Sequence, residues 1–140
     1  MENKIITGIS QKLFETFGSD YTIYTENVEQ YLNPPCFCIE LLQSSLRQIV
    51  SNHYRLENLF DIHFFTNVNE SKNEFSRIAD ILYDALEYIS VDNDLVRGLN
   101  MHYEIVDDVL HFLLNYNMNV QKEITPTDKM ETLQTRSELG

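Results

Sequence analysis

Residues 99–120 read LNMHYEIVDDVLHFLLNYNMNV, and this stretch carries the clearest strand pattern in the chain. Apolar and polar residues alternate on both sides of Asp107-Asp108, which predicts a β-hairpin closed by a two-residue turn. The turn sets a register with Ile105 opposite Leu110, Tyr103 opposite Phe112, Met101 opposite Leu114 and Leu99 opposite Tyr116 on one face, and Glu104 opposite His111 and Asn100 opposite Asn115 on the other. We therefore expect an antiparallel sheet with one buried face and one exposed face.

The segments before this hairpin predict two helices and further strands. Apolar stripes at helical spacing indicate the helices: Ile5, Ile6, Ile9, Leu13 and Phe17, ended by Gly18, and Phe75, Ile78, Leu82, Leu86 and Ile89, preceded by the capping-box spacing of Ser71-Lys72-Asn73-Glu74. Strands are expected over 21–24, 36–42 and 59–65, with the polar residues 43–58 forming the tip of a long hairpin. This order indicates an α+β fold in which two helices pack on one face of an antiparallel β-sheet.

The chain length of 140 residues suits one domain, which we expect to span residues 1–122. From Glu123 the periodicity ends, Pro126 interrupts the chain, and no aromatic residue follows. Residues 123–140 are therefore interpreted as a flexible C-terminal tail.

The charge balance disfavours a protein held by nucleic-acid phosphates. The formal net charge is −12, and no stretch concentrates enough basic residues to follow a phosphate backbone. No apolar run approaches the roughly 20 residues that span a bilayer, and the N-terminal residues lack the pattern of a signal peptide. We expect a protein made in a cytoplasm, with no membrane partner and no specific nucleic-acid partner.

The residue patterns that would support catalysis are weak. The glycines lack the spacing of a phosphate-binding loop, and no Gly-x-Ser-x-Gly motif is present. Cys36 and Cys38 lie two residues apart on an expected strand, which suits reduced thiols packed in a sheet better than a zinc site or a disulfide. We expect no enzyme, no catalytic residue and no cofactor.

The histidines and aspartates leave two weaker alternatives open. His111 opposite Glu104 is interpreted as a cross-strand polar pair, with a tuned acid–base pair as the alternative. The sequence indicates no partner for His53, His63 or His102. Asp92-Asn93-Asp94 lacks the glycine of an EF-hand loop, so no metal site is expected, with a weak surface ion site as the alternative.

A basic segment stands out in this acidic chain. Residues 41–56 contain Arg47, His53 and Arg55 and no acidic residue. They are interpreted either as a solvated hairpin or as a contact that docks on the acidic surface of a second copy or a partner. The candidate acceptors are Glu26, Asn27, Glu29 and the acidic edge of the sheet.

Several blocks together resemble the phage tail terminator family of prophages and phage-derived tails of Gram-positive bacteria. They are the stretch 21–30 (YTIYTENVEQ), 35–37 (PCF), 60–62 (FDI), 95–98 (LVRG), 100–104 (NMHYE) and 109–112 (VLHF). The resemblance covers about residues 1–122. It implies a small α+β subunit with a tail-terminator-like fold.

The resemblance also implies a role. Such subunits form a six-membered ring at the head-proximal end of the tail tube, stop tube polymerisation and provide the surface that joins the head. The implied partners are copies of the chain, the tail tube protein, and sheath and head–tail connector proteins, with DNA passing through the lumen. The implied place is the neck of a virion tail or a phage-like particle. The alternatives are a head–tail connector or neck completion protein, and an adaptor module outside the virion.

Overall fold

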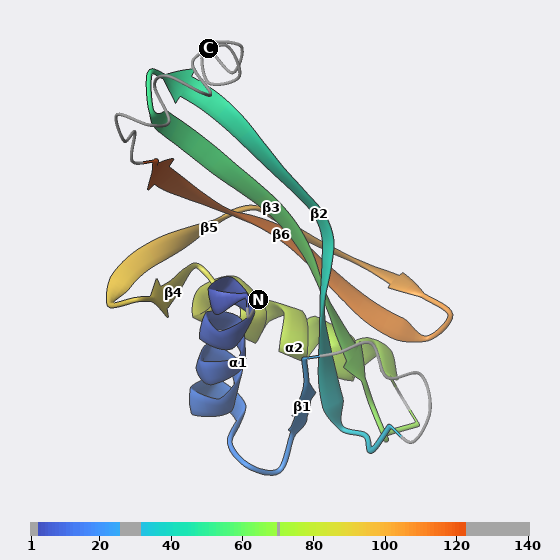
Figure 1. The fold of residues 1–140 in the computed structure, drawn as a ribbon. Helices are drawn as coiled ribbons and strands as arrows, with labels where there is room; N and C mark the ends of the chain where they lie inside the picture. Colours follow the sequence, from blue (N-terminus) through green and yellow to red (C-terminus); the bar gives the residue numbers. More distant parts are fainter. Residues whose placement is uncertain (1–2, 26–31, 70, 123–140) are drawn as a thin grey trace.

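The structure is a computed structural model that describes residues 3–25, 32–69 and 71–122 (Figure 1). Two helices and six strands follow one another in the chain. Their order is α1 (Lys4–Phe17), β1 (Thr22–Tyr24), β2 (Cys36–Val50), β3 (His53–Phe65), α2 (Ser71–Ala85), β4 (Tyr88–Val91), β5 (Asp94–Val106) and β6 (Val109–Gln121).

All six strands join one sheet in the order β1-β2-β3-β6-β5-β4. The pair β1–β2 is parallel and the other pairs are antiparallel. The expected α+β class is confirmed, whereas the expectation of a purely antiparallel sheet is wrong at this edge. In the parallel pair, Thr22 lies opposite Cys36 and Tyr24 lies opposite Cys38.

Both helices contribute to one hydrophobic core on one face of the sheet. The inward side chains of β2, β3 and β6 alternate with outward ones, as the strand period requires. The core combines Ile5, Ile9 and Leu13 of α1 and Phe75, Ile78 and Leu82 of α2 with Phe37, Ile39, Phe60, Ile62, Phe64, Leu110, Phe112, Leu114 and Tyr116 of the sheet. The opposite face carries no helix in the described chain (Figure 1).

The first helix has the predicted extent, and local chemistry defines both of its ends. The Asn3 side chain caps it by accepting hydrogen bonds from the backbone N–H groups of Ile5 at 2.9 Å and Ile6 at 3.3 Å. Gly18 ends it with φ 82°, a value that glycine adopts without steric cost.

The second helix is shorter than predicted. It ends at Ala85, and Ile89, expected on its apolar stripe, lies instead in β4 with 1% of its surface exposed. Residues 88–91 alternate exposed and buried side chains, which is the period of a strand. Ser71 is the first helical residue, and its hydroxyl donates to Asp108 Oδ1 at 2.7 Å, so the expected capping box is not the observed arrangement.

The predicted hairpin of β5 and β6 is confirmed near its turn. Asp107 and Asp108 both have positive φ, and Ile105 lies opposite Leu110. Beyond His102 the register shifts by one residue, so Leu99 faces Asn115 and Gly98 faces Tyr116. The register pairs predicted for Met101 with Leu114, Leu99 with Tyr116 and Asn100 with Asn115 are therefore wrong, although the Asn100 side chain still donates to Asn115 Oδ1 at 3.4 Å. The cause is a bulge at Asn100, where φ is 54°.

The long hairpin of β2 and β3 is confirmed, but its polar tip is regular strand. The two strands stay paired from Cys36 with Phe65 to Val50 with His53, with register shifts between Leu41 and Gln43 and between Gln48 and Val50. We call residues 43–58 the arm. In Figure 1 the arm extends away from both helices, and the end of β6 accompanies it.

Candidate functional site

The outer face of the arm presents two arginines side by side. Arg47 of β2 lies opposite Arg55 of β3 in the register, on the face that the helices leave uncovered. The Arg47 side chain is 59% exposed, and its Nη2 atom lies 3.6 Å from Glu57 Oε2. A single carboxylate at this distance does not neutralise two guanidinium groups, so the pair of arginines keeps a net positive charge.

The other residues predicted to make a partner contact have different outcomes. His53 is exposed and lies opposite Val50, two residues beyond Arg55 along β3. The structure therefore brings Arg47, Arg55 and His53 to one end of the arm. Glu26, Asn27 and Glu29 lie outside the described residues, so the contact between the arm and these acceptors stays a prediction.

The arm also has an open strand edge with apolar side chains. β1 pairs with β2 only at Cys36–Cys38, so no described strand covers residues 39–50 of β2, which we call the β2 edge. Four apolar residues here are 46–63% exposed: Leu42, Leu46, Ile49 and Val50. Unpaired backbone groups beside exposed apolar side chains form a template for another strand. The sequence pattern did not reveal this open edge, because these four apolar residues do not alternate regularly with polar ones.

A second open edge lies on the other side of the sheet. β4 pairs only with Asp94–Arg97, so no described strand covers residues 99–106 of β5, which we call the β5 edge. Its exposed apolar residues are Leu99, Tyr103, Ile105 and Val106. Glu104 lies on this edge, and Asp107 and Asp108 form the turn that follows it. The β5 edge is therefore apolar and acidic, whereas the arm is apolar and basic.

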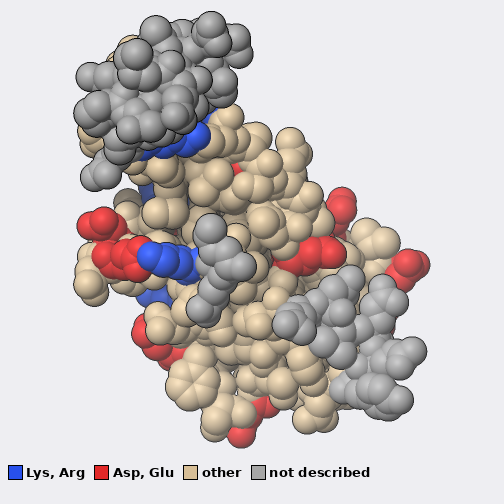
Figure 2. Space-filling view, viewed as in Figure 1, with Lys and Arg blue, Asp and Glu red and all other residues tan. Residues whose placement is uncertain are grey.

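The charges are distributed unevenly over the visible surface. Figure 2 shows Lys and Arg atoms at the upper end of the molecule, where the arm ends in Figure 1, and further Lys and Arg atoms beside acidic ones at the left margin. Most Asp and Glu atoms visible from this side surround the lower body and its margins.

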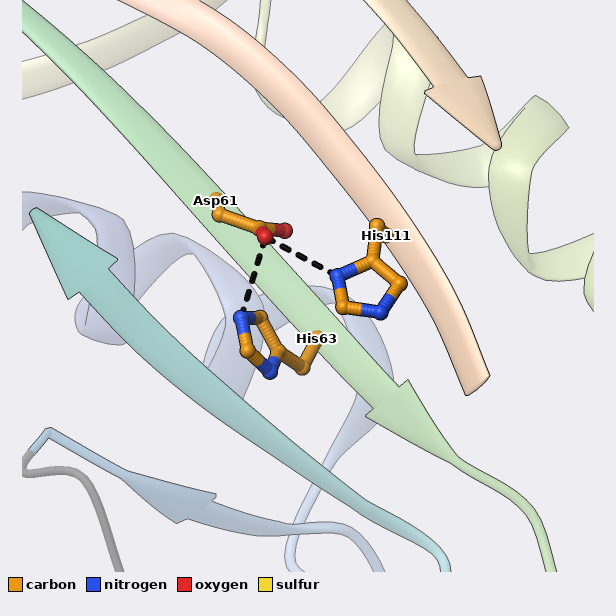
Figure 3. A group of neighbouring side chains, drawn as sticks. All are labelled: Asp61, His63 and His111. Atoms are coloured by element: carbon orange, nitrogen blue, oxygen red, sulfur yellow. Dashed lines mark hydrogen bonds and ion pairs between the residues drawn. The ribbon is translucent and has the colours of Figure 1, made fainter. Parts of the chain in front are cut away.

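The outer face also carries a cluster of titratable side chains that we call the histidine cluster: Asp61 and His63 of β3 and His111 of β6. Figure 3 shows both imidazole rings turned toward the Asp61 carboxylate. Asp61 Oδ2 lies 2.9 Å from His111 Nδ1 and 3.1 Å from His63 Nε2, and the two rings lie 4.6 Å apart. Glu40 of β2 adds a carboxylate oxygen 3.4 Å from His63 Nε2.

Burial and neighbouring charges shift the pKa values of Asp61 and His63 in opposite directions. Burial alone would raise the pKa of Asp61, but hydrogen bonds and charges from His63 and His111 lower that pKa below its ordinary value. The pKa of His63 is raised, first by its interaction with Asp61 and against the effect of burial. The cluster therefore keeps a carboxylate ionised in a largely buried position.

Sequence reasoning missed this cluster. The register does place Glu104 opposite His111, but the ion pair of His111 is with Asp61 on the neighbouring strand. His63, for which the sequence indicated no partner, contacts Asp61 and Glu40. The available signal was the spacing Asp61-x-His63, which places both side chains on one face of a strand.

The two cysteines are free and buried in β2. Burial raises the pKa of Cys36, and it raises the pKa of Cys38 to about 11. Neutral, enclosed thiols are poor nucleophiles, which agrees with the interpretation that they are packing residues.

The described part of the chain contains no helix that is both long and apolar enough to cross a membrane.

Comparison with known proteins gives one family and one fold. The model of the family described as "Phage tail terminator protein" matches residues 4–128. One solved structure shares 12% sequence identity with this chain at a TM-score of 0.50, over 86% of this chain and 95% of its own chain. At this identity the likeness concerns the fold alone. No curated protein matches the chain.

Proposed function

We infer the function from the premise that this chain belongs to the phage tail terminator protein family. The chain is accordingly a structural protein of a phage tail. We propose that copies of the chain form a ring, taken as six-membered, on the head-proximal end of the tail tube. The ring ends tube polymerisation and offers the surface to which the head joins. The family match is the observation that carries this proposal.

The two open edges support a ring closed by contacts between unlike surfaces. A ring forms when one surface of each copy binds a different surface of the next copy. The β2 edge and the β5 edge lie on opposite sides of the β3–β6 pair, so one copy offers both halves of such a contact. The basic arm of one copy would lie against Glu104, Asp107 and Asp108 of the next, with apolar side chains on both sides.

The remaining partners follow from the place of the ring. One side of the ring would contact the tail tube protein, and the other would contact the head–tail connector, with the sheath as a further neighbour. DNA would pass through the lumen without being bound specifically, as the net charge of −12 favours. This role, in the neck of the tail, needs neither catalysis nor a cofactor.

Charge reversal of the arm tests the ring contact. Arg47→Glu with Arg55→Glu should remove the chain from rings and from tails, because two attractive contacts become repulsive. The fold should persist, since an exposed ion pair such as Arg47–Glu57 contributes at most about 1 kcal/mol. Immunoblots of purified tails and circular dichroism of the purified variant measure the two effects.

The matched control makes the same change of charge on the helices. Lys12→Glu with Lys72→Glu alters α1 and α2, away from the arm, and should enter tails normally. Normal incorporation of the arm variant would exclude the arm from the contact.

The proposed terminator role is tested by deleting the chain from a producing strain, where electron microscopy should show tubes of uncontrolled length. Headless tubes of normal length would contradict the terminator role and favour a connector.

A further inference from the structure

We propose that the histidine cluster, together with Glu40, is a binding site for a divalent transition-metal ion of the Zn²⁺ class. This site is independent of the proposed ring and departs from the expectation that the chain has no metal site. The four residues offer two imidazole nitrogens and two carboxylate oxygens. Imidazole nitrogens select zinc, copper, nickel or iron over the calcium and magnesium that prefer oxygen ligands.

The distances between the donor atoms fit one small ion. Donor atoms of a tetrahedral zinc site, with bonds of 2.0–2.1 Å, lie roughly 3.3 Å from one another. Here the separations are 2.9 Å for Asp61 Oδ2 to His111 Nδ1, 3.1 Å for Asp61 Oδ2 to His63 Nε2 and 3.4 Å for His63 Nε2 to Glu40 Oε1. The donor atoms of Asp61, His63 and His111 all lie within 4.8 Å of one another. Small rotations of these three side chains would bring their donor atoms around a common centre, with the Glu40 carboxylate beside His63.

The cluster also contains a polar atom that the described protein leaves unsatisfied. Asp61 Oδ1 is buried without a hydrogen-bond partner in the described chain, whereas His63 Nε2 lies 3.1 Å from Asp61 Oδ2 and 3.4 Å from Glu40 Oε1. A buried polar atom without a partner costs about 1–3 kcal/mol. A bound cation would coordinate the His63 nitrogen and balance the charge of Asp61, which is only 7% exposed.

The backbone holds these donors in a fixed arrangement. Glu40 lies opposite Asp61 across β2 and β3, and His63 lies opposite His111 across β3 and β6. The donors therefore come from three neighbouring hydrogen-bonded strands rather than from loops, which is how preorganised sites are built.

The position of the site indicates what the ion would do. Two hollows of the described surface lie along α1 and contain no histidine or cysteine. The cluster is thus separate from them, on the outer face of the sheet. We infer a structural ion that clamps β2, β3 and β6 together close to where the arm leaves the body, rather than a catalytic centre.

Zinc titration of the full chain tests the site. The protein is stripped with a chelator, dialysed and titrated with Zn²⁺ against a chromophoric competitor, and with Co²⁺ by visible absorption. We expect one ion per chain, a tetrahedral Co²⁺ spectrum without a thiolate band, and a higher melting temperature with Zn²⁺ than without it. Failure to bind one Zn²⁺ per chain would overturn the proposal, whatever the outcome for the ring.

Matched variants assign the ion to these residues. His63→Gln and His111→Gln keep side-chain volume and polarity, and each should weaken zinc binding by more than about tenfold, since even residues that only support metal ligands change affinity by 10- to 100-fold. His102→Gln is the control, because His102 is exposed on β5 outside the cluster. Cys38→Ser is the second control. Equal affinity in all four variants, or loss only in Cys38→Ser, would overturn the assignment.

Discussion

Tyr116 is a polar side chain placed at the centre of the core. Its ring is fully buried and lies 6.1 Å from the ring of Phe60 in an edge-on arrangement. Its hydroxyl donates to the backbone carbonyl of Leu86 at 2.5 Å, directly after the last turn of α2. The bond satisfies a carbonyl that the end of a helix leaves without a partner.

Removing this hydroxyl should reduce stability and change its pH dependence. Burial raises the pKa of Tyr116 above its ordinary value of 10.0, so the folded chain holds this proton more tightly than the unfolded chain. Its contribution is complete below pH 10 and declines as the pH rises above 10. Tyr116→Phe should lower the free energy of unfolding by about 1–2 kcal/mol at pH 7, and should make its decline above pH 10 less steep.

Urea unfolding at several pH values measures both effects. Tyr88→Phe is the matched control, since Tyr88 is 44% exposed on β4 and its hydroxyl should contribute little. A loss of stability equal to that of the control would show that the Tyr116 hydroxyl bond is unimportant.

The histidine cluster shows what sequence can and cannot predict at this scale. Strand alternation predicts that Asp61 and His63 share a face and that His111 faces outward. It does not predict that β3 pairs with β6, because the two strands are far apart in the chain and many pairings are compatible with their patterns. The contact of Asp61 with His111 depends on the pairing of β3 with β6. From the sequence, the only neighbour that could be predicted for His111 was therefore Glu104.

At the scale of elements, α1 and β4 make an unusually close contact. Gly8 is buried on α1, and a Cβ atom added there would lie 2.7 Å from the carbonyl oxygen of Ser90. The Lys4 ammonium group reaches Asp92 Oδ2 at 2.9 Å beside this contact. Because Gly8 has no side chain, α1 can lie against β4, the strand at this edge of the sheet.

Gly8→Ala sets two effects against each other. Alanine favours a helix interior by about 1 kcal/mol over glycine, but the added methyl group meets the backbone of a paired strand, which cannot move cheaply. Overpacking of this kind costs about 1–3 kcal/mol, so we expect a net loss of up to about 2 kcal/mol in the free energy of unfolding, measured by thermal and urea denaturation. Gln11→Ala, on the exposed side of α1, should change stability by less than about 0.5 kcal/mol. A stabilising Gly8→Ala would show that helix and strand separate easily.

Sequence patterns predicted which helices and strands form better than they predicted the residues at which these begin and end. The apolar stripe of α2 continued in register to Ile89, so periodicity alone did not reveal that the chain leaves the helix after Ala85 and begins β4. The bulge at Asn100 was equally hidden, because one extra residue on a strand leaves no local signal unless the partner strand is known. The turn at Asp107-Asp108 was predictable because turn and pairing are neighbours in the chain.

At the scale of the whole molecule, the sheet has two strand edges without a partner strand in the described chain. Monomeric proteins usually cover or charge long strand edges, because exposed edges pair with other chains. Here the β2 edge and the β5 edge remain open in the described chain and carry opposite charges around their apolar side chains. The proposed contact between unlike surfaces would account for this arrangement, and it would form a closed ring if the rotation between copies is constant.

Mixing two defective variants distinguishes this contact from a symmetrical one. For this test the substitutions are neutral, so that no new attraction arises: an arm variant, Arg47→Gln with Arg55→Gln, keeps a normal β5 edge, and an edge variant, Ile105→Asn with Val106→Asn, keeps a normal arm. Each alone should fail to form rings at a concentration at which the unchanged chain forms them. In a mixture, the normal arm of the edge variant binds the normal β5 edge of the arm variant, and the two remaining surfaces are both defective. Native mass spectrometry should therefore show heterodimers and no rings. A contact of arm with arm would instead leave the mixture without heterodimers, because every such pair would include a defective arm.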